Sequence, residues 1–262
     1  NGWQLGRTRL VQFYLRRARR LLPAFVFTAS TVIVLSVFFT TFDARTQAFE
    51  TARAGSLFAA NLQLMLFRAN SYFTSTEQVN PLLHTWSLSL EEQIYLVIPV
   101  VLLAVWKIGR GNDPKTRKLM TTSISVMAAI SFLASFSFTY ARGVWPFAAE
   151  SHLARGLEAS RMIAFYSPFT RVWEFLAGAL VAILGTRFRG LGGRLLFVTG
   201  FAAIVGTSLS IDAAAAFPGL IALVPVAGTV AMILGTEWRI RGFSTLESRL
   251  SGWIGDRSYS IY

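Results

Sequence analysis

Residues 80–99 read NPLLHTWSLSLEEQIYLVIP. The stretch places His84 and two adjacent carboxylates, Glu91 and Glu92, at the head of an apolar run over residues 94–106. The polar cluster and the apolar run together are long enough for a membrane-spanning helix. Ionisable groups are costly to bury in such a segment unless they have partners or a function. The stretch therefore predicts a transmembrane helix with a polar cluster at one end.

Two helix starts fit this stretch. A helix that begins near residue 83 places His84, Glu91 and Tyr95 on one stripe, because seven residues make about two turns. Glu92 then lies about 100° round the helix from Glu91. Alternatively, Ser89 and Glu92 have the spacing of a capping box, which starts the helix later and leaves His84 in the preceding loop.

The composition is that of a polytopic membrane protein. The 262 residues are 53% hydrophobic and include 22 Phe, and the mean hydropathy is +0.50, above what a soluble domain of this length shows. The net charge of +12 could indicate a nucleic-acid partner. However, the basic residues lie between apolar runs, as membrane flanks do, so no nucleic acid is expected. Cysteine is absent, which excludes disulfides and thiolate metal sites.

The apolar runs predict an all-α bundle of about six spans. Residues 55–67 are apolar but too short to cross, and an interfacial or re-entrant piece is expected there. Residues 43–53 are expected to be a polar loop. Pro23 is expected in the first turn of its span, where proline loses no needed donor, and Pro99 is expected to kink the second. The spans are expected at residues 23–42, 83–106, 119–140, 172–184 and 195–211, with a last one that ends near Gly235.

The charges of the loops predict an orientation. When the loops are assigned alternately to two sides, the side of the N-terminal segment collects 18 of the 25 Lys and Arg residues. The positive-inside rule makes that side cytoplasmic. The polar cluster of residues 84–92 is then expected in the outer half of the bilayer. The other side holds Arg45, Arg53, Arg68, Arg142, Arg155, Arg161 and Arg171.

The basic stretch RRARR at residues 16–20 has two interpretations. The simpler is a collar that binds lipid phosphates and fixes the orientation. The alternative is that Arg17 and Arg20, one helical turn apart, clamp the phosphate groups of an anionic cytoplasmic donor.

The polar cluster also has two interpretations. A carboxylate such as Glu91 can orient the His84 imidazole and raise its basicity, the pattern that deprotonates a hydroxyl. The structural alternative is that Glu91 and Glu92 bond helix termini or neutralise nearby arginines. Metal binding is not expected, because two histidines without a His-x-x-x-His spacing hardly assemble a ligand set.

Further polar and aromatic residues are candidates. Arg171 and Glu174 are expected to form an intrahelical ion pair, or alternatively to face a central cavity and contact substrate. Gly178 suits close helix packing. Residues 217–228, FPGLIALVPVAG, predict a broken helix whose freed carbonyls line a cavity. His152 is interpreted as a surface residue. An interfacial belt, or alternatively a platform for a sugar ring, is expected from Trp86, Trp145 and Trp173.

Five segments follow one another along the chain in a recognisable order. The segment HTWSLSLEEQ within residues 80–99 is the most specific. In this order they resemble the acyltransferase-3 family of integral-membrane O-acyltransferases, over residues 1–262 as a single, partial transmembrane domain. The segments are RRARRLLPA (16–24), residues 80–99, YSPFTRVWEFLAGAL (166–180), FPGLIALVPVAGTVAMIL (217–234) and IGDRSYSIY (254–262).

The resemblance implies a function. It implies a bundle of about ten spans in the bacterial inner membrane, in contact with lipid, that moves an acyl group, commonly acetyl, from cytoplasmic acyl-CoA. The acceptor would be a hydroxyl of an extracytoplasmic glycan or lipid-linked saccharide, such as O-antigen, peptidoglycan or exopolysaccharide. Acyl-CoA is a donor substrate, and no bound cofactor is expected. The resemblance suggests Arg17 and Arg20 near the donor, and a working cavity lined by His84, Trp86, Ser87, Glu91, Glu92 and Tyr95.

Two parts of the family pattern lie outside the sequence. The first two spans, with a histidine usually proposed as catalytic, would precede residue 1, and a closing Leu-Trp-His-type segment would follow residue 262. We therefore expect an internal piece of a longer protein, inactive by itself. The rival interpretation is a transporter or a lipid- or glycan-binding scaffold, because intramembrane carboxylates and broken helices also mark permeation paths.

Overall fold

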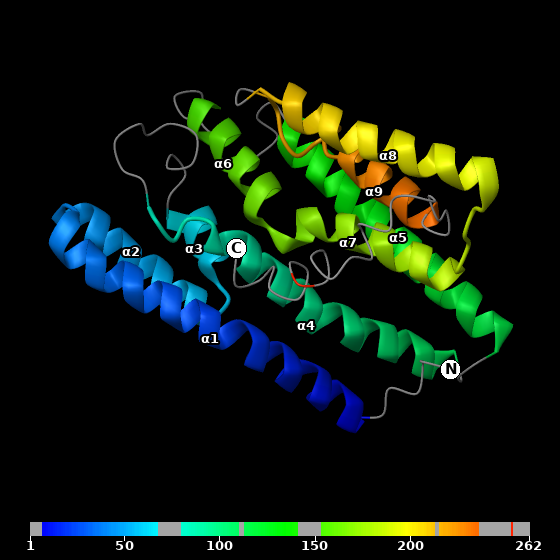
Figure 1. Ribbon diagram of the computed structural model, residues 1–262, viewed down its shortest axis with the longest axis horizontal. Helices are drawn as coiled ribbons and strands as arrows, with labels where there is room; N and C mark the ends of the chain where they lie inside the picture. Colours follow the sequence, from blue (N-terminus) through cyan, green and yellow to red (C-terminus); the bar gives the residue numbers. More distant parts are fainter. Residues whose placement is uncertain are drawn as a thin grey trace.

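The structure, a computed structural model, describes residues 7–67, 80–109, 113–140, 153–212, 215–235 and Trp253. All regular structure within these ranges is helical, which confirms the all-α expectation (Figure 1). The helices are α1 (Arg7–Phe39), α2 (Phe42–Ser56), α3 (Ala60–Phe67), α4 (Thr85–Ile108), α5 (Pro114–Tyr140), α6 (Leu153–Tyr166), α7 (Pro168–Leu184), α8 (Gly190–Ser210) and α9 (Leu223–Leu234).

Five helical segments of the described chain are long and apolar enough to cross a membrane, so the fold is that of a polytopic membrane protein. The sixth expected span is shorter. Its helix, α9, has 12 residues, or about 18 Å of rise, because turns at residues 218–222 delay its start. The five long segments are Leu10–Phe39, Thr85–Ile108, Pro114–Tyr140, Ser160–Leu184 and Gly190–Ser210.

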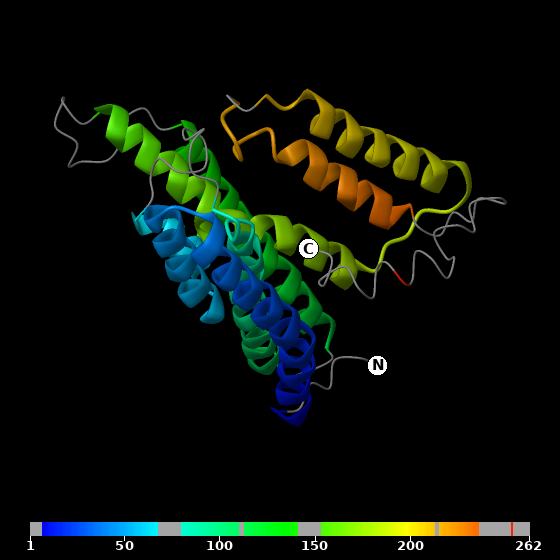
Figure 2. The ribbon, with the colours of Figure 1, turned by 60° about the vertical axis from the view of Figure 1, so that its left-hand side comes forward.

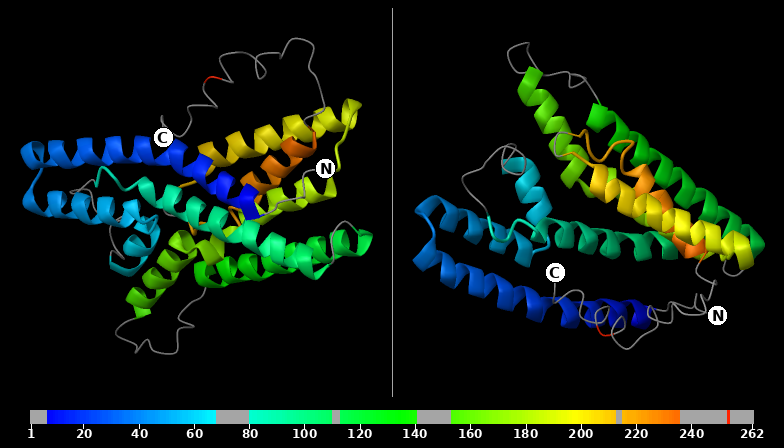
Figure 3. Two further views of the ribbon diagram at one scale, coloured as in Figure 1. Left: turned by 90° about the horizontal axis from the view of Figure 1, so that it is seen from below. Right: turned by 45° about the horizontal axis from the view of Figure 1, so that its top comes forward.

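The prediction of a polar loop at residues 43–53 is wrong, because these residues form most of α2. The Thr41 side chain caps this helix by accepting a hydrogen bond from the Ala44 amide at 3.4 Å. Small residues then let α2 lie against α1, as Figures 1 and 3 show. A Cβ on Gly55 would stand 2.8 Å from the Phe25 ring. Helical structure is favoured here by close packing that polarity alone does not reveal.

Pro23 does not open its helix as expected. It lies inside α1, which already begins at Arg7. The arginine-rich residues before it have high helix propensity, so the helix extends through them. Proline removes one backbone donor, which leaves the Arg19 carbonyl without its usual partner four residues on. Pro99 likewise lies inside α4.

Helices α1 and α4 run antiparallel. The Tyr14 hydroxyl donates to the Leu96 carbonyl at 2.9 Å, whereas Phe25, later in α1, packs with Leu82, earlier in the chain than α4. Helix α4 also packs on α5 and α7, through a buried cluster centred on Leu176. This arrangement brings α1 and α7 to the helix that begins in residues 80–99.

Helices α8 and α9 form a closely packed pair on one side of the bundle (Figure 2). Glycines allow their backbones to touch, since a Cβ on Gly228 would stand 2.7 Å from the Gly200 carbonyl oxygen. Contact between α9 and α7 joins the pair to the rest of the molecule.

Candidate functional site

The start of α4 is fixed by a buried amide. The Asn80 side chain donates to the Thr51 hydroxyl at 2.8 Å and accepts from the Leu82 amide at 3.0 Å. The helix begins at Thr85, and His84 occupies the position before it without a capping side-chain bond. His84 therefore precedes the helix, as the second interpretation held, but the helix starts at Thr85, close to the residue 83 of the first interpretation.

The predicted capping box is nevertheless wrong. Ser89 lies inside α4, where its hydroxyl donates to the Thr85 carbonyl at 3.0 Å and accepts from the Ala60 amide at 3.3 Å. Ser89 is thus a contact between α3 and α4. The turn at residues 81–84 starts the helix before a cap at Ser89 is needed.

Arg17, Glu92 and Tyr95 come together between α1 and α4. Arg17 Nη2 lies 2.6 Å from Glu92 Oε1, and Arg17 Nε donates to both carboxylate oxygens at 2.6 and 2.8 Å. The guanidinium carbon stands 3.7 Å from the centroid of the Tyr95 ring. Only 16% of the Arg17 side chain and 11% of the Glu92 side chain is exposed. The charges of Arg17 and Glu92 thus neutralise each other in a mostly buried site.

This pair changes the expected separation of the charged groups. Glu92 lies seven residues, about 10 Å, from the start of α4 at Thr85, and sixteen residues, about 24 Å, from its end at Ile108. Arg17 therefore lies nearer the His84 end of α4 than the Lys107 end. The sequence predicts Arg17 on the cytoplasmic side and Glu92 in the outer half of the bilayer. The antiparallel packing of α1 along α4 instead brings the two side chains together.

The other arginines of the cluster have different surroundings. Arg20 is exposed, as are Arg16 and Arg19, whereas Arg17 turns toward α4. Arg17 and Arg20 are one turn apart as predicted, but only Arg20 keeps its side chain at the surface.

Glu91 and Glu92 are adjacent but have different partners. Glu92 is held by Arg17. Glu91 is half-buried, and it makes no hydrogen bond or ion pair with any residue in the described ranges. Of the two carboxylates, only Glu92 is engaged by an arginine of the described ranges.

His84 and Glu91 are not brought together. Their separation of seven residues corresponds to about 10 Å of helical rise, and no hydrogen bond joins these two described side chains. The half-buried His84 remains at the end of α4. Ser87 also lies there, and its hydroxyl donates to the His84 carbonyl at 3.2 Å. The structure therefore does not show Glu91 orienting the His84 imidazole directly.

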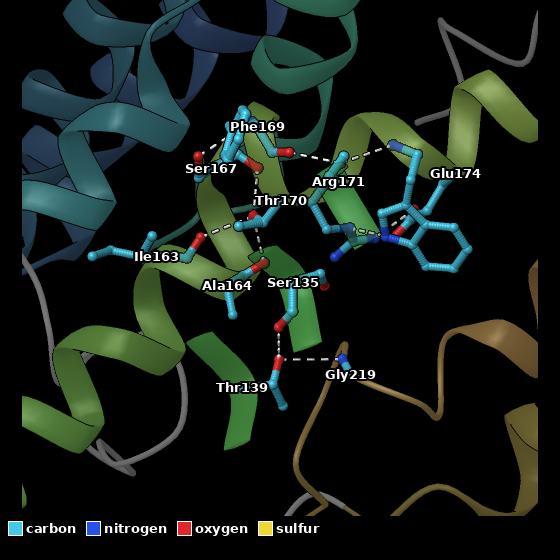
Figure 4. A network of polar contacts seen from close by, with 12 residues as sticks. Ser135, Thr139, Ile163, Ala164, Ser167, Phe169, Thr170, Arg171, Glu174 and Gly219 are labelled. Carbon is cyan, nitrogen blue, oxygen red and sulfur yellow. Dashed lines mark hydrogen bonds and ion pairs between the residues drawn. The ribbon is translucent and has the colours of Figure 1, made fainter. Parts of the chain in front are cut away.

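Arg171 and Glu174 form the expected intrahelical ion pair, three residues apart in α7. Arg171 Nη2 donates to Glu174 Oε2 at 3.1 Å. Figure 4 shows the two side chains pointing toward each other. Their side chains are 15% and 17% exposed, respectively. The pair is therefore largely enclosed by protein.

The start of α7 is held by its cap and by hydrogen bonds with α5 and α6 (Figure 4). Ser167 caps it, accepting from the Phe169 amide at 3.2 Å. From α5, the Ser131 hydroxyl donates to the Phe169 carbonyl at 2.6 Å and accepts from the Trp173 amide at 3.2 Å. Thr170 donates to the Ala164 carbonyl of α6 at 2.9 Å. These bonds fix the orientation of the α7 turn that carries Arg171.

The tryptophans depart from the expected belt. Trp173 is 5% exposed and packs edge-to-face on Phe132 at 5.1 Å. Trp86 packs on Phe165, with ring centroids 4.7 Å apart. Both are held inside the bundle by other aromatic rings, so the belt prediction is wrong for them. Trp145 and His152 lie outside the described residues.

Two amides join three helices at a point that the sequence interpretation missed. The fully buried Asn61 of α3 donates to the Gln93 side chain of α4 at 3.1 Å and to the Tyr166 carbonyl of α6 at 3.1 Å. Gln93 returns a bond to Asn61 at 2.9 Å and donates to the Phe58 carbonyl at 2.6 Å. The sequence signal for this contact is a single amide side chain in each of two apolar segments, Asn61 in one and Gln93 in the other.

No group of three or more His, Asp or Glu side chains in the described ranges is placed to hold a metal ion. The site therefore consists of two ion pairs, Arg17–Glu92 and Arg171–Glu174, and one carboxylate, Glu91. The Tyr95 ring, which Arg17 contacts, also packs edge-to-face on the Phe175 ring of α7, with centroids 6.0 Å apart.

Comparison with known proteins identifies relatives of the chain. The chain is 27% identical to the peptidoglycan O-acetyltransferase OatA of Listeria monocytogenes over 269 residues, which is 99% of this chain and 40% of that protein. It is 28% identical to the putative peptidoglycan O-acetyltransferase YrhL of Bacillus subtilis, over 95% of this chain and 38% of that protein. No solved structure matches the chain.

A third relative has a different description. The chain is 24% identical to the putative membrane-bound transacylase BcsY of Komagataeibacter xylinus, over 100% of this chain and 62% of that protein. The chain thus spans about two fifths of the first two relatives and less than two thirds of the third. The family described as "Acyltransferase domain" (Acyl_transf_3) matches residues 2–262. The chain is therefore a multi-pass membrane protein that belongs to the acyltransferase-3 family of membrane O-acyltransferases.

Proposed function

We propose that the whole protein transfers an acetyl group from acyl-CoA to a hydroxyl of a cell-envelope glycan. Family membership supports acyl transfer, and two relatives are described as peptidoglycan O-acetyltransferases. On this proposal the protein lies in the bacterial inner membrane, with acyl-CoA on the cytoplasmic side and the glycan outside.

The observation that carries the proposal is the difference between Glu91 and Glu92. A glutamate engaged by an arginine, as Glu92 is by Arg17, is electrostatically satisfied. Glu91 lies beside it in a membrane-spanning helix without a partner among the described side chains. A carboxylate kept in such a position at a high solvation cost is typical of a functional group.

Glu91 can act as a general base in this reaction. The acceptor hydroxyl oxygen forms a bond to the carbonyl carbon of the thioester, and its proton passes to the Glu91 carboxylate. The carbon–sulfur bond then breaks, and the sulfur of CoA leaves with that proton as a thiol. His84, about 10 Å away along the helix, is the second candidate base. Glu92 acts indirectly, by holding Arg17 and thereby the contact between α1 and α4.

The donor's phosphates require cations that are exposed at the surface, where a ligand can reach them. Arg20 meets this requirement, as it is exposed on α1 together with Arg16 and Arg19. Exposed guanidinium groups bind phosphate through paired hydrogen bonds. We therefore assign the phosphate contact mainly to Arg20. Arg17 could bind the donor only after breaking its ion pair with Glu92.

Mass spectrometry of surface glycans, with and without the full-length gene, tests the function. O-acetyl esters should be present with the gene and absent without it. Glycans that carry the same esters in both strains would contradict it. If the protein is instead a transporter or a scaffold, substitution of Glu91 should leave the amount of O-acetyl ester unchanged.

A further inference from the structure

The Arg171–Glu174 pair leaves two donor atoms and one acceptor atom without a hydrogen bond in the described part of the chain. Arg171 Nε and Glu174 Oε1 approach to 2.6 Å, but neither atom makes a hydrogen bond within the described part of the chain. Arg171 Nη1 is also buried without a hydrogen-bond partner there. Buried polar atoms are rarely left in this condition, because each such atom costs free energy. The pair therefore offers Nη1 as a donor to a further molecule, and Oε1, which already lies 2.6 Å from Nε, can accept a second contact.

Aromatic rings lie beside these atoms. The guanidinium carbon of Arg171 stands 5.4 Å from the Phe217 ring centroid and 5.8 Å from that of Phe165. The loop after Phe217 is held to the end of α5, since the Gly219 amide donates to the Thr139 hydroxyl at 3.2 Å. Figure 4 shows this loop opposite the turn of α7 that carries the pair. The rings thus come from two separate segments that hydrogen bonds keep in place.

Open space continues the same face of α7. Gly178 follows Glu174 by four residues and Arg171 by seven, so the three share one stripe of the helix. A Cβ built on Gly178 would meet no atom of the described residues within 4 Å. Close helix packing, which the sequence suggested for this glycine, is therefore not its role in the described structure. The glycine leaves room one helical turn beyond Glu174 on the same face.

The charge of the site indicates the kind of ligand. Glu174 neutralises Arg171, so a phosphate placed here would meet a carboxylate as well as a guanidinium. A hydroxyl group fits better, because it can accept from Nη1 and donate to Oε1 at once. Apolar ring faces beside a few polar groups are typical of sites for small neutral ligands, such as a sugar ring with its C–H face on an aromatic ring.

We propose that Arg171, Glu174 and Gly178 form the acceptor subsite, which binds a neutral, hydroxyl-bearing sugar ring of the glycan. This inference rests on the proposed acyl transfer, and it assigns the acceptor to α7 and the phosphates of the donor to the exposed arginines of α1. Gly178 provides the space that the ring occupies.

Substitutions of the pair test the subsite in the full-length protein. Arg171→Lys keeps the positive charge but removes the Nη1 donor. Glu174→Gln replaces the carboxylate oxygen Oε1 with a weaker, neutral hydrogen-bond acceptor. We expect each to lower the glycan O-acetyl ester in cells about tenfold or more, the effect of a lost hydrogen bond to a charged group. The affinity of the purified protein for acetyl-CoA, measured in liposomes, should stay at the wild-type value. Arg161→Gln is a matched control, because Arg161 is exposed on the neighbouring helix α6.

Filling the space tests the role of Gly178. Gly178→Leu should abolish the ester without changing the affinity for acetyl-CoA or the amount of protein in the membrane, and Gly178→Ala should reduce the ester only in part. Gly206→Leu is the matched control, because Gly206 in α8 also has no neighbour within 4 Å of a built Cβ. It should leave the ester unchanged.

The outcomes separate this inference from the function on which it rests. A wild-type protein that forms no ester would contradict the proposed function. Wild-type esters that persist in Arg171→Lys, Glu174→Gln and Gly178→Leu would overturn the subsite alone. A tenfold loss of affinity for acetyl-CoA in these variants would also overturn it, because the face would then bind the donor.

Discussion

Arg17 of α1 and Glu92 of α4 form a two-pronged ion pair, in which Arg17 Nη2 lies 2.6 Å from Glu92 Oε1 and Arg17 Nε donates to both oxygens. The pair joins residues 75 positions apart in the chain. It fixes the position of the arginine-rich part of α1 along the length of α4. The adjacent Glu91 has no arginine partner of this kind in the described chain.

Breaking this pair should destabilise the protein. Glu92→Gln leaves the Arg17 charge without its counter-charge in a mostly buried site, which costs about 3–5 kcal/mol. We expect a lower unfolding temperature in detergent and less protein in the membrane. The double variant Arg17→Met/Glu92→Leu should recover much of the loss, since it removes both charges. A Glu92→Gln protein as stable as wild type would show that the pair does not hold the two helices.

Loss of the buried amide at position 61 should separate α3 from α4 and α6. Asn61→Leu leaves Gln93 and the Tyr166 carbonyl without their partner, at a cost of about 1–3 kcal/mol. Thermal unfolding in detergent measures this effect. Thr199→Val is a suitable control, because the Thr199 hydroxyl is on exposed α8 and bonds only within its own helix. Equal unfolding temperatures for the two variants would contradict the role of Asn61.

Two glycines of α8 and α9 should respond in opposite ways to alanine. A Cβ at position 228 would stand 2.7 Å from the Gly200 carbonyl oxygen, whereas one at position 206 meets nothing within 4 Å. Gly228→Ala should therefore push α8 and α9 apart and lower the unfolding temperature. Gly206→Ala should be neutral or stabilise the helix by up to about 1 kcal/mol. The reverse order would mean that the two helices do not pack through these glycines.

Much of the fold follows from the sequence, because long apolar segments have few alternatives to helices in a membrane. The same reasoning places residues 80–99 at the head of α4 and pairs Arg171 with Glu174, since that contact is local, three residues apart in one helix. Local spacing is enough to predict such features.

Contacts between distant segments could not be predicted in this way. The pairing of Arg17 with Glu92 depends on how far α1 slides along α4, which no periodicity in either helix specifies. Residues 43–53 look like a loop because they are polar, yet small residues on one face let them pack as α2. Gly178 likewise reads as a packing glycine until the structure shows open space beside it.

The central claim is that Glu91 takes part in acyl transfer while Glu92 holds the structure, and Glu91→Gln in the full-length protein tests it most directly. Surface-glycan mass spectrometry, with immunoblotting of the membrane fraction, measures the ester and the amount of protein together. Glu50→Gln, on the exposed side of α2, is the matched control. We expect Glu91→Gln to abolish the O-acetyl ester at a wild-type amount of protein. Esters retained at that amount would remove Glu91 from the chemistry.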